Sequence, residues 1–406
     1  MPYYSDPLQD GSGLFTSGAP IRRWTVKAAE PVSYEVEMAE GLFDPASTLL
    51  LEKGDPQPSG PGTGRVRRVI VTDTVVDELY GEAVRGYLDH HGVEYEICVL
   101  PAGETAKTWD NVLTVVETLD RFGIDRRREP VIGIGGGVLL DIVGFVASTY
   151  RRGTPYIRVP TTLIGLVDAG VGVKTGFNFN GHKNRLGTYF AAERNLLDRT
   201  FLKTLDERHV SNGLAEILKI ALIKDYRLLT LLESYGTDLV ATRMQGPYDG
   251  PHPDPALEVM ERAIHGMLEE LQPNLREHKL ERVVDYGHTF SPTIEMHALP
   301  ELLHGEAVCV DMALTTVLAE RRGLISREQR ERVFRVMDDL RLPSWHPLCV
   351  PDVLLPALAD TVRHRNGRQR LPLPVGIGSA VFVNDVTERE LAEAAEHMAE
   401  AAAVTR

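Results

Sequence analysis

The sequence predicts an α/β fold in its N-terminal half and a mainly helical fold in its C-terminal half. Between Arg68 and Ile134, short apolar runs typical of strands alternate with longer segments that have the periodicity of amphipathic helices. From about Leu205 onward, apolar residues recur three and four positions apart over long stretches, which indicates helices. Because strands that alternate with helices form parallel sheets with helices on their faces, we expect a sheet domain followed by a helical domain.

The N-terminal elements are expected in the following order. Residues 1–20 show no periodicity and should form a loose arm, whereas the alternation of Thr25–Met38 predicts a strand. Gly54–Gly64 is dense in Gly and Pro and should be a loop. The sheet domain then has strands at Arg68–Thr72, Tyr95–Leu100 and Pro130–Ile134, and helices at Val75–His90 and Trp109–Phe122.

The C-terminal half should consist of helices with little strand. We place the boundary near residues 198–206, which gives one domain over residues 21–200 and a second over residues 201–406. The expected elements are helices at Leu214–Ile223, Leu257–Leu271, Ala307–Arg321 and Arg327–Leu340, a short strand at Ala380–Val383 and a terminal helix from Glu388.

The composition excludes some classes of partner and compartment. With a net charge of −14, the chain is not expected to bind nucleic acid or an anionic membrane, although a cleft lined by Lys and Arg can still attract a small anionic substrate. Cys98, Cys309 and Cys349 are widely spaced, which argues against a disulfide framework and fits a reducing compartment. The N-terminus lacks a signal-peptide pattern, and no apolar run reaches the roughly 20 residues of a membrane helix. We therefore expect a cytoplasmic protein.

Two motifs in the sheet domain suit a phosphate-containing ligand. A strand runs into Gly135, Gly136 and Gly137, and glycines there let a pyrophosphate approach the backbone at a helix N-terminus. The spacing is not the usual G-x-G-x-x-G, so a tight strand-to-helix turn is the alternative. Glu104 and Lys107 follow another strand and suit ribose hydroxyls and phosphate; alternatively, they belong to a solvated loop.

Residues 151–187 place charged and polar side chains in an otherwise apolar stretch. They include Asp168, Lys174, Lys183 and Asn184 among glycines and threonines. Charges in such surroundings must be paired or must face a polar cleft. Lysines suit phosphates and developing oxyanions, so this segment favours an anion site.

A third group has the residue types of a metal site. Glu216 and Lys219 lie one helical turn apart on an apolar helix, and His288 and His304 follow far along the chain. Two histidines and one carboxylate, with a position left open, are a common catalytic zinc arrangement. The spacing is long-range, so each histidine alone is equally compatible with an ordinary core or surface role.

Taken in this order, the residues resemble the sugar phosphate cyclase superfamily, whose best-known member is 3-dehydroquinate synthase. The resemblance spans roughly Ile70 to Gly378, and it implies a Rossmann-like N-terminal domain and a helical metal-binding domain, usually in a homodimer, with the site between the domains. It is carried by Gly135–Asp141, Pro160-Thr-Thr, Asp168, Lys174-Thr-Gly, Lys183-Asn184, Glu216, Lys219, Gly287-His-Thr-Phe and Leu303-His-Gly-Glu.

The resemblance implies three sets of site residues. A zinc or cobalt ion would be held by Glu216, His288 and His304. The NAD site would be lined by Asp73, Glu104, Lys107, Gly135, Gly136, Gly137, Asp141, Thr161 and Thr162. The sugar phosphate would be faced by Arg152, Asp168, Lys174, Lys183, Asn184 and Lys219.

Departures from 3-dehydroquinate synthase point to a different substrate. Ser291-Pro292 stands where that enzyme has Gly-His, Asp285 stands where it has Asn, and Arg363-His364-Arg365 replaces a Lys-rich segment. An added carboxylate and a lost Lys disfavour a substrate with its own carboxylate. A neutral hydroxymethyl end, as in sedoheptulose 7-phosphate, fits better. Asp285 with His364 resembles the 2-epi-5-epi-valiolone synthases, which supply C7-cyclitol natural product biosynthesis.

The expected reaction is cyclisation through transient oxidation by NAD, phosphate elimination, re-reduction and intramolecular aldol closure. The alternatives within the superfamily are 2-epi-valiolone synthase, desmethyl-4-deoxygadusol synthase and 3-dehydroquinate synthase. An iron-type polyol dehydrogenase shares the architecture and the metal triad. A non-catalytic regulator that binds NAD or sugar phosphate is the alternative outside enzymes.

Overall fold

The computed structural model describes residues 13–17, 23–28, 30–52 and 66–405. The chain forms two compact units, residues 1–34 and residues 35–406. The predicted boundary near residues 198–206 lies inside the second unit and stays a prediction. The predicted loop at Gly54–Gly64 lies outside the described residues, as does most of the predicted loose arm.

The first unit contains a hairpin that the sequence analysis did not predict. Strand β1 (Gly13–Ser17) pairs antiparallel with β2 (Arg23–Lys27). The single strand predicted over Thr25–Met38 is wrong, because β2 ends at Lys27 and β3 (Glu35–Met38) belongs to the second unit. Pro31 lies between the two strands, and proline cannot donate a ladder hydrogen bond.

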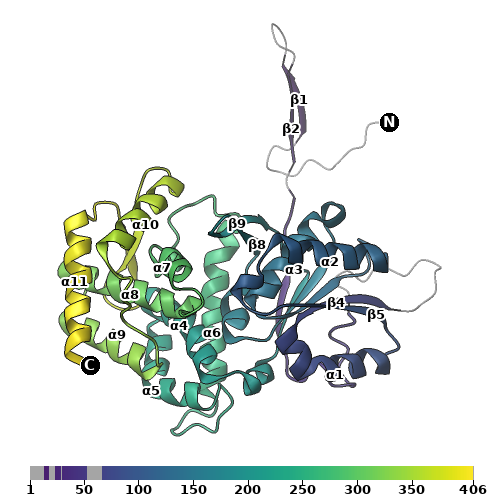
Figure 1. The fold of residues 1–406 in the computed structure, drawn as a ribbon, viewed down its shortest axis with the longest axis horizontal. Helices are drawn as coiled ribbons and strands as arrows, with labels where there is room; N and C mark the ends of the chain where they lie inside the picture. The colour runs from purple at the N-terminus through teal and green to yellow at the C-terminus, as the bar shows by residue number, and fades with distance from the viewer. Residues whose placement is uncertain (1–12, 18–22, 29, 53–65, 406) are drawn as a thin grey trace. The chain divides into compact units, whose positions relative to one another are not determined.

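A six-stranded sheet that contains β4 and β5 forms one part of the second unit (Figure 1). Its strand order is β3-β10-β7-β6-β4-β5. Every neighbouring pair in this sheet is parallel. Its further strands are β4 (Arg67–Asp73), β5 (Glu94–Leu100), β6 (Val131–Gly135), β7 (Tyr156–Pro160) and β10 (Arg194–Leu197). β6 and β7 are buried along their whole length and are mainly apolar, with the buried Arg158 as the charged exception in β7.

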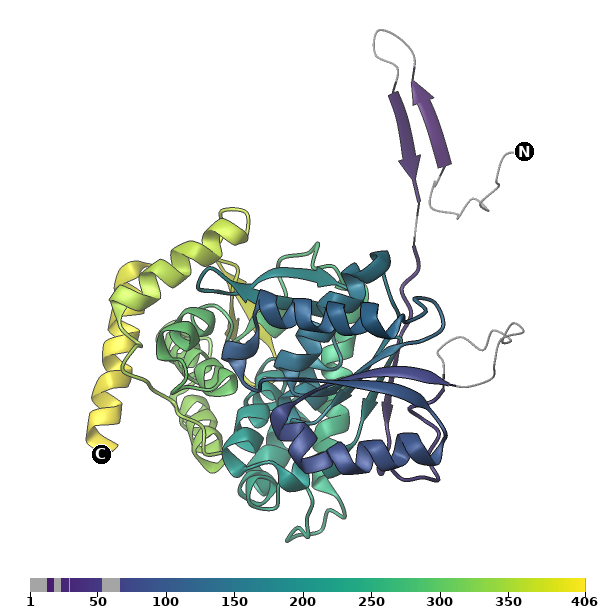
Figure 2. The ribbon, with the colours of Figure 1, turned by 45° about the vertical axis from the view of Figure 1, so that its right-hand side comes forward.

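Helices cover both faces of this sheet, as Figures 1 and 2 show. They are α1 (Thr74–His90), α2 (Trp109–Phe122) and α3 (Gly137–Thr149). Val115 of α2 and Ile142 of α3 share one apolar core with the sheet, and Tyr87 of α1 belongs to the other. A hairpin of β8 (Lys174–Phe179) and β9 (His182–Tyr189) packs beside α3.

The rest of the second unit is mainly helical. Its elements are α4 (Glu207–Ile223), α5 (Tyr226–Ala241), α6 (Pro255–Leu271), α7 (Ser291–Ala298), α8 (His304–Arg321), α9 (Arg327–Asp339), α10 (Pro351–His364) and α11 (Glu388–Thr405), with the small sheet of β11 (Leu371–Pro374) and β12 (Ala380–Val383). Residues 210–223 of α4 and 305–319 of α8 are buried, so these two helices form the centre of the helical core.

The parallel sheet followed by helices confirms the predicted fold class. No helix in the described part of the chain combines the length and the apolar composition that a membrane span needs.

Candidate active site

The glycine turn lies at the point in the sheet where the order of successive strands reverses. From β4 the chain adds β5 on one side, and β6, β7 and β10 on the other, so the switch point lies between β4 and β6. Asp73 ends β4 and Gly135 ends β6, and ligands of such sheets bind outside the carboxyl ends of the strands at this point. A Cβ on Gly135 would lie 2.6 Å from Leu139 and 3.2 Å from Asp73 Oδ2, so only glycine leaves this position open.

Helix α3 begins directly at this turn. Gly136 is its N-cap, and no described side chain caps its first N–H groups. These N–H groups and the positive end of the helix form a site suited to a phosphate. Thr161 continues from β7 beside the turn, where its N–H donates to Gly135 O at 3.0 Å, and Thr162 lies 3.3 Å from a Cβ built on Gly136. The structure therefore gathers the predicted glycine turn, Asp73 and both threonines at one edge.

A buried lysine joins the two predicted ligand sites. Lys107 is 3% exposed, and its Nζ donates to Asp141 Oδ2 and to Asn184 Oδ1, each at 2.5 Å. Burial opposes its charge, but Asp141 and Glu104 raise the pKa of Lys107 above its ordinary value. Glu104 also accepts a bond from Asn178 Nδ2 at 2.7 Å. Because Asn184 comes from β9, this cluster ties the β8–β9 hairpin to α3.

Helix α4 supplies a carboxylate and an ammonium group that are both buried. Gly213 lets α4 pack closely, since a Cβ there would lie 2.7 Å from Ile164 N. Lys219 pairs with Glu216 one turn earlier, and its Nζ lies 3.9 Å from Asp168 Oδ1. Burial opposes its charge, whereas Glu216 and Asp168 raise the pKa of Lys219. Burial also raises the pKa of Asp168, which sits in a π-helical turn at Gly165–Ala169.

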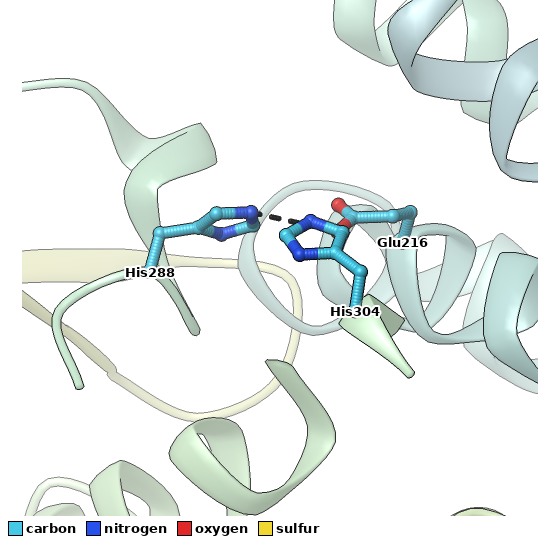
Figure 3. A group of neighbouring side chains, drawn as sticks. All are labelled: Glu216, His288 and His304. Carbon is cyan, nitrogen blue, oxygen red and sulfur yellow. Dashed lines mark ion pairs between the residues drawn. The ribbon is translucent and has the colours of Figure 1, made fainter. Parts of the chain in front are cut away.

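Glu216, His288 and His304 converge from three separate segments, as Figure 3 shows. One ligand atom from each residue lies within 4.8 Å of the others. The Nε2 atoms of both histidines lie 3.5 Å from Glu216 Oε1, and this buried oxygen has no hydrogen-bond partner among the described residues. A buried carboxylate oxygen facing two imidazole nitrogens fits a divalent ion such as Zn²⁺.

The surroundings of the two histidines set their charge. His288 Nδ1 lies 3.1 Å from Tyr286 O, which holds Nδ1–H toward the backbone and leaves the Nε2 lone pair facing Glu216. Burial lowers the pKa of His288 to about 3. Burial also opposes a charge on His304, but Glu295 and Glu216 raise the pKa of His304 to about 9. Despite burial, Lys219 and His288 hold the pKa of Glu216 well below its usual range.

A buried aspartate fixes the loop that carries His288. Asp311 Oδ2 on α8 accepts hydrogen bonds from the backbone N–H groups of Thr289, Phe290 and Ser291 at 2.9, 2.6 and 2.9 Å. Burial raises the pKa of Asp311 to about 6 even though these three donors favour its charged form. The loop is thereby attached to the same helix that begins with His304.

The predicted specificity residues do not all meet. Asp285 is buried, its carboxylate pairs with Arg282 and lies 3.5 Å from Arg365 Nη2, and despite burial these cations lower the pKa of Asp285. The side chain of His364 is 59% exposed and pairs with Asp360 at 3.4 Å, so Arg365 is the neighbour that faces Asp285. Pro292 lies in the first turn of α7, one residue after the loop that Asp311 holds.

Two of the predicted cations lie toward solvent. Lys174 begins β8, is 56% exposed at its side chain and pairs with Glu277. Arg152 is exposed at the far end of α3 from the glycine turn, because α3 ends at Thr149. A helix of this length spans roughly 20 Å, so Arg152 lies far from the glycine turn.

Sequence reasoning missed Glu277, Arg282, Glu295 and Asp311, and it named Arg365 only as a neighbour of His364 in Arg363-His364-Arg365. Glu295 and Asp311 stand among apolar neighbours in Ile294-Glu295-Met296 and Val310-Asp311-Met312, and an acid in such a context is a signal for a buried partner. For Glu277 and Arg282 we find no comparable signal.

Comparison with known proteins identifies the family. The 3-dehydroquinate synthase N-terminal family matches residues 97–212, and the 3-dehydroquinate synthase C-terminal family matches residues 213–363. The chain belongs to the 3-dehydroquinate synthase family. The matched segments of this family contain the glycine turn, Lys219 and the Glu216, His288 and His304 cluster, whereas Asp73 and His364 lie outside them.

Within the family, the chain is similar to proteins named 2-epi-5-epi-valiolone synthase. It is 62% identical to one from Streptomyces albus over 91% of this chain and 88% of that protein, and 60% identical to one from an Actinoplanes species over 92% of each. The solved structure of ValA, a 2-epi-5-epi-valiolone synthase from Streptomyces hygroscopicus with NAD+ and Zn2+ bound, has a TM-score of 0.86. It is 54% identical, and the match covers 93% of this chain and 100% of that chain. These relatives confirm the predicted resemblance.

Proposed function

We propose that this chain is a 2-epi-5-epi-valiolone synthase, which cyclises sedoheptulose 7-phosphate with loss of phosphate and uses NAD and a divalent metal ion. The observation that carries this proposal is the convergence of Glu216, His288 and His304 beside Lys219 and Asp168. The similarity to relatives of that name over most of the chain supports it.

The cofactor residues divide between the two parts of the second unit. We assign NAD to the carboxyl edge of the sheet, with its pyrophosphate at the turn of Gly135 to Gly137 and with Asp73, Glu104, Lys107, Asp141, Thr161 and Thr162 around it. We assign Zn²⁺ or Co²⁺ to Glu216, His288 and His304. When bound, NAD supplies a reversible hydride acceptor and the metal a Lewis acid for a substrate oxygen.

Two side chains of this site can stabilise a negative charge on the substrate and transfer a proton. Lys219 stays charged although it is buried, so its ammonium group can stabilise an alkoxide that forms on the substrate. Burial raises the pKa of Asp168, and this carboxyl group 3.9 Å from Lys219 Nζ can hold a proton or release it. We assign Lys174, Lys183, Asn184 and Arg152 to the phosphate side of the substrate.

Asp285 gives a physical reason for a substrate with a neutral end. Its carboxylate engages Arg282 and approaches Arg365, so a carboxylate on the substrate would meet two cations that are already paired. A hydroxymethyl group needs no counter-charge, which favours a seven-carbon sugar phosphate over a sugar acid phosphate. We propose Asp285 with Pro292 and His364 as specificity positions, and we expect His364 to contribute less because it is exposed.

We also propose a cytoplasmic homodimer. Cys98, Cys309 and Cys349 are buried and free, which suits a reducing compartment. The acidic net charge of −14 supports a small-molecule substrate without nucleic acid or membrane partners.

The test is a product analysis. Purified protein with NAD and Co²⁺ or Zn²⁺ should convert sedoheptulose 7-phosphate into one carbocycle, identified by NMR, with one phosphate released per turnover. Absorbance of reduced nicotinamide should not accumulate, because the hydride returns within each cycle. Stoichiometric accumulation of NADH would instead indicate a polyol dehydrogenase. Absence of phosphate release from every seven-carbon sugar phosphate would refute the cyclase assignment.

A further inference from the structure

A second buried carboxylate touches one of the histidines of the metal cluster. Glu295 lies on α7, its side chain is 3% exposed, and its Oε2 lies 2.8 Å from His304 Nδ1. The same carboxylate accepts bonds from Lys183 Nζ at 2.6 and 2.8 Å. Lys183 comes from β9 and His304 begins α8, so Glu295 joins three elements.

These contacts determine which nitrogen of His304 keeps its proton in the neutral ring, the form that a metal ion binds. An ionised carboxylate only accepts hydrogen bonds, so Nδ1 must donate to Glu295. The lone pair then lies on Nε2, the atom that faces Glu216 Oε1 at 3.5 Å. The equivalent partner of His288 is a backbone carbonyl, Tyr286 O, which no side-chain substitution removes.

Lys183 is a competing donor at the same nitrogen. Its Nζ lies 3.0 Å from His304 Nδ1, and an ammonium group cannot accept a hydrogen bond. If Glu295 were absent, Lys183 would donate to the Nδ1 lone pair and favour the tautomer that is protonated on Nε2. That tautomer cannot bind a metal through Nε2.

We propose that Glu295 is a positioning residue that fixes the metal-binding tautomer and the ring orientation of His304 and keeps Lys183 from reversing it. The inference rests on the proposed metal role of Glu216, His288 and His304. It also gives Lys183 a role that resemblance did not suggest: its ammonium group is held by Glu295, so it acts on His304 through that carboxylate.

The experiment measures Co²⁺ binding without substrate, by competition with a chromophoric chelator and by the visible absorption of the bound ion. Glu295→Gln should weaken Co²⁺ binding about 10- to 100-fold and change the absorption spectrum. Adding Lys183→Met to that variant should recover about tenfold or more of the affinity, because the competing donor is gone. Glu233→Gln is the matched control, since it removes an ion pair with Arg332 between α5 and α9, and it should leave both readouts unchanged.

Several results would overturn the inference. Wild-type affinity and spectrum in Glu295→Gln would show that His304 needs no carboxylate. A loss that Lys183→Met does not repair would mean that Glu295 supports the fold only. Should Glu295→Gln not fold, the double variant Glu295→Gln with Lys183→Met decides, because it should bind Co²⁺ within about tenfold of wild type, and a larger loss would overturn the inference. Wild-type protein that binds no Co²⁺ would refute the proposed metal itself, whereas protein that binds Co²⁺ but does not cyclise the sugar would refute only the proposed reaction.

Discussion

Gly305 is a point of close contact between α8 and α4, and an alanine there should displace His304, one of the proposed metal ligands. A Cβ at this position would lie 2.0 Å from Asn212 O, and the Gly305 N–H already donates to Asn212 Oδ1 at 2.6 Å. The distance of 2.0 Å from this Cβ to Asn212 O is about 1.4 Å shorter than the 3.4 Å at which ordinary van der Waals contact begins. Because the obstacle is the backbone of a buried helix, no side-chain rotation relieves the clash.

The first turn of α8 must therefore move by about 1 Å, and it carries His304 with it. Overpacking of this kind costs about 1–3 kcal/mol in the free energy of unfolding, offset in part by the roughly 1 kcal/mol advantage of Ala over Gly in a helix. A metal ligand displaced by about 1 Å should weaken metal binding by about tenfold or more. We expect the Gly305→Ala protein to fold but to bind Zn²⁺ poorly.

The assay combines metal competition with urea unfolding. Gly86→Ala is the matched control, because Gly86 is exposed in α1 and a Cβ there meets nothing within 4 Å. This control should gain up to about 1 kcal/mol of stability and keep its metal affinity. If Gly305→Ala bound Zn²⁺ as tightly as wild type, the argument that this contact positions His304 would be wrong.

Three further outcomes follow from buried charges. The pKa of Asp311 is raised from 3.8 to about 6, so the folded state binds the proton more tightly than the unfolded chain does. As the pH rises from about 4 to about 6, the free energy of unfolding of wild type should therefore fall by about 3 kcal/mol relative to that of Asp311→Asn. Urea titrations that show no change in this difference with pH would contradict the prediction. Arg158 is fully buried and donates hydrogen bonds to backbone carbonyls in the loop of residues 169–174. Arg158→Met should therefore lower the free energy of unfolding in urea by about 2–4 kcal/mol and raise KM. If both values were unchanged, the conformation of this loop would not depend on Arg158. A strong chelator, or Glu216→Gln, should abolish phosphate release while NAD binding, followed by calorimetry, persists; full turnover in chelator would exclude the metal from the reaction.

The fold class was predictable because its signals are local. Apolar runs and helical periodicity predicted β4, α1, β5, α2 and β6 with boundaries within a few residues. The error at Thr25–Met38 has the same origin, since alternation continues past Pro31 although the pairing does not.

The site was predictable only in part. The residue types of Glu216, His288 and His304 suggested a metal, but resemblance was needed to group them, because their spacing does not follow a helix or a strand. Glu295 and Arg365 act through contacts between distant elements, and no local pattern encodes those contacts. His364 and Arg365 are adjacent in sequence, yet only the structure distinguishes the exposed side chain from the one that reaches Asp285.

Because α8 is buried along residues 305–319, substitutions in this helix should be tolerated less well than substitutions in the turn after α10. A helix enclosed on every side transmits any alteration to its neighbours, so the proposed metal site at the start of α8 can vary little without loss of the fold. The turn after α10, which presents Arg365 to Asp285, is held by hydrogen bonds of Gln369 with Val386, but its residues His364, Asn366 and Arg368 are exposed. Libraries restricted to His364 and Arg368 should therefore be an efficient way to alter which sugar phosphate is accepted while metal affinity and thermal stability are preserved.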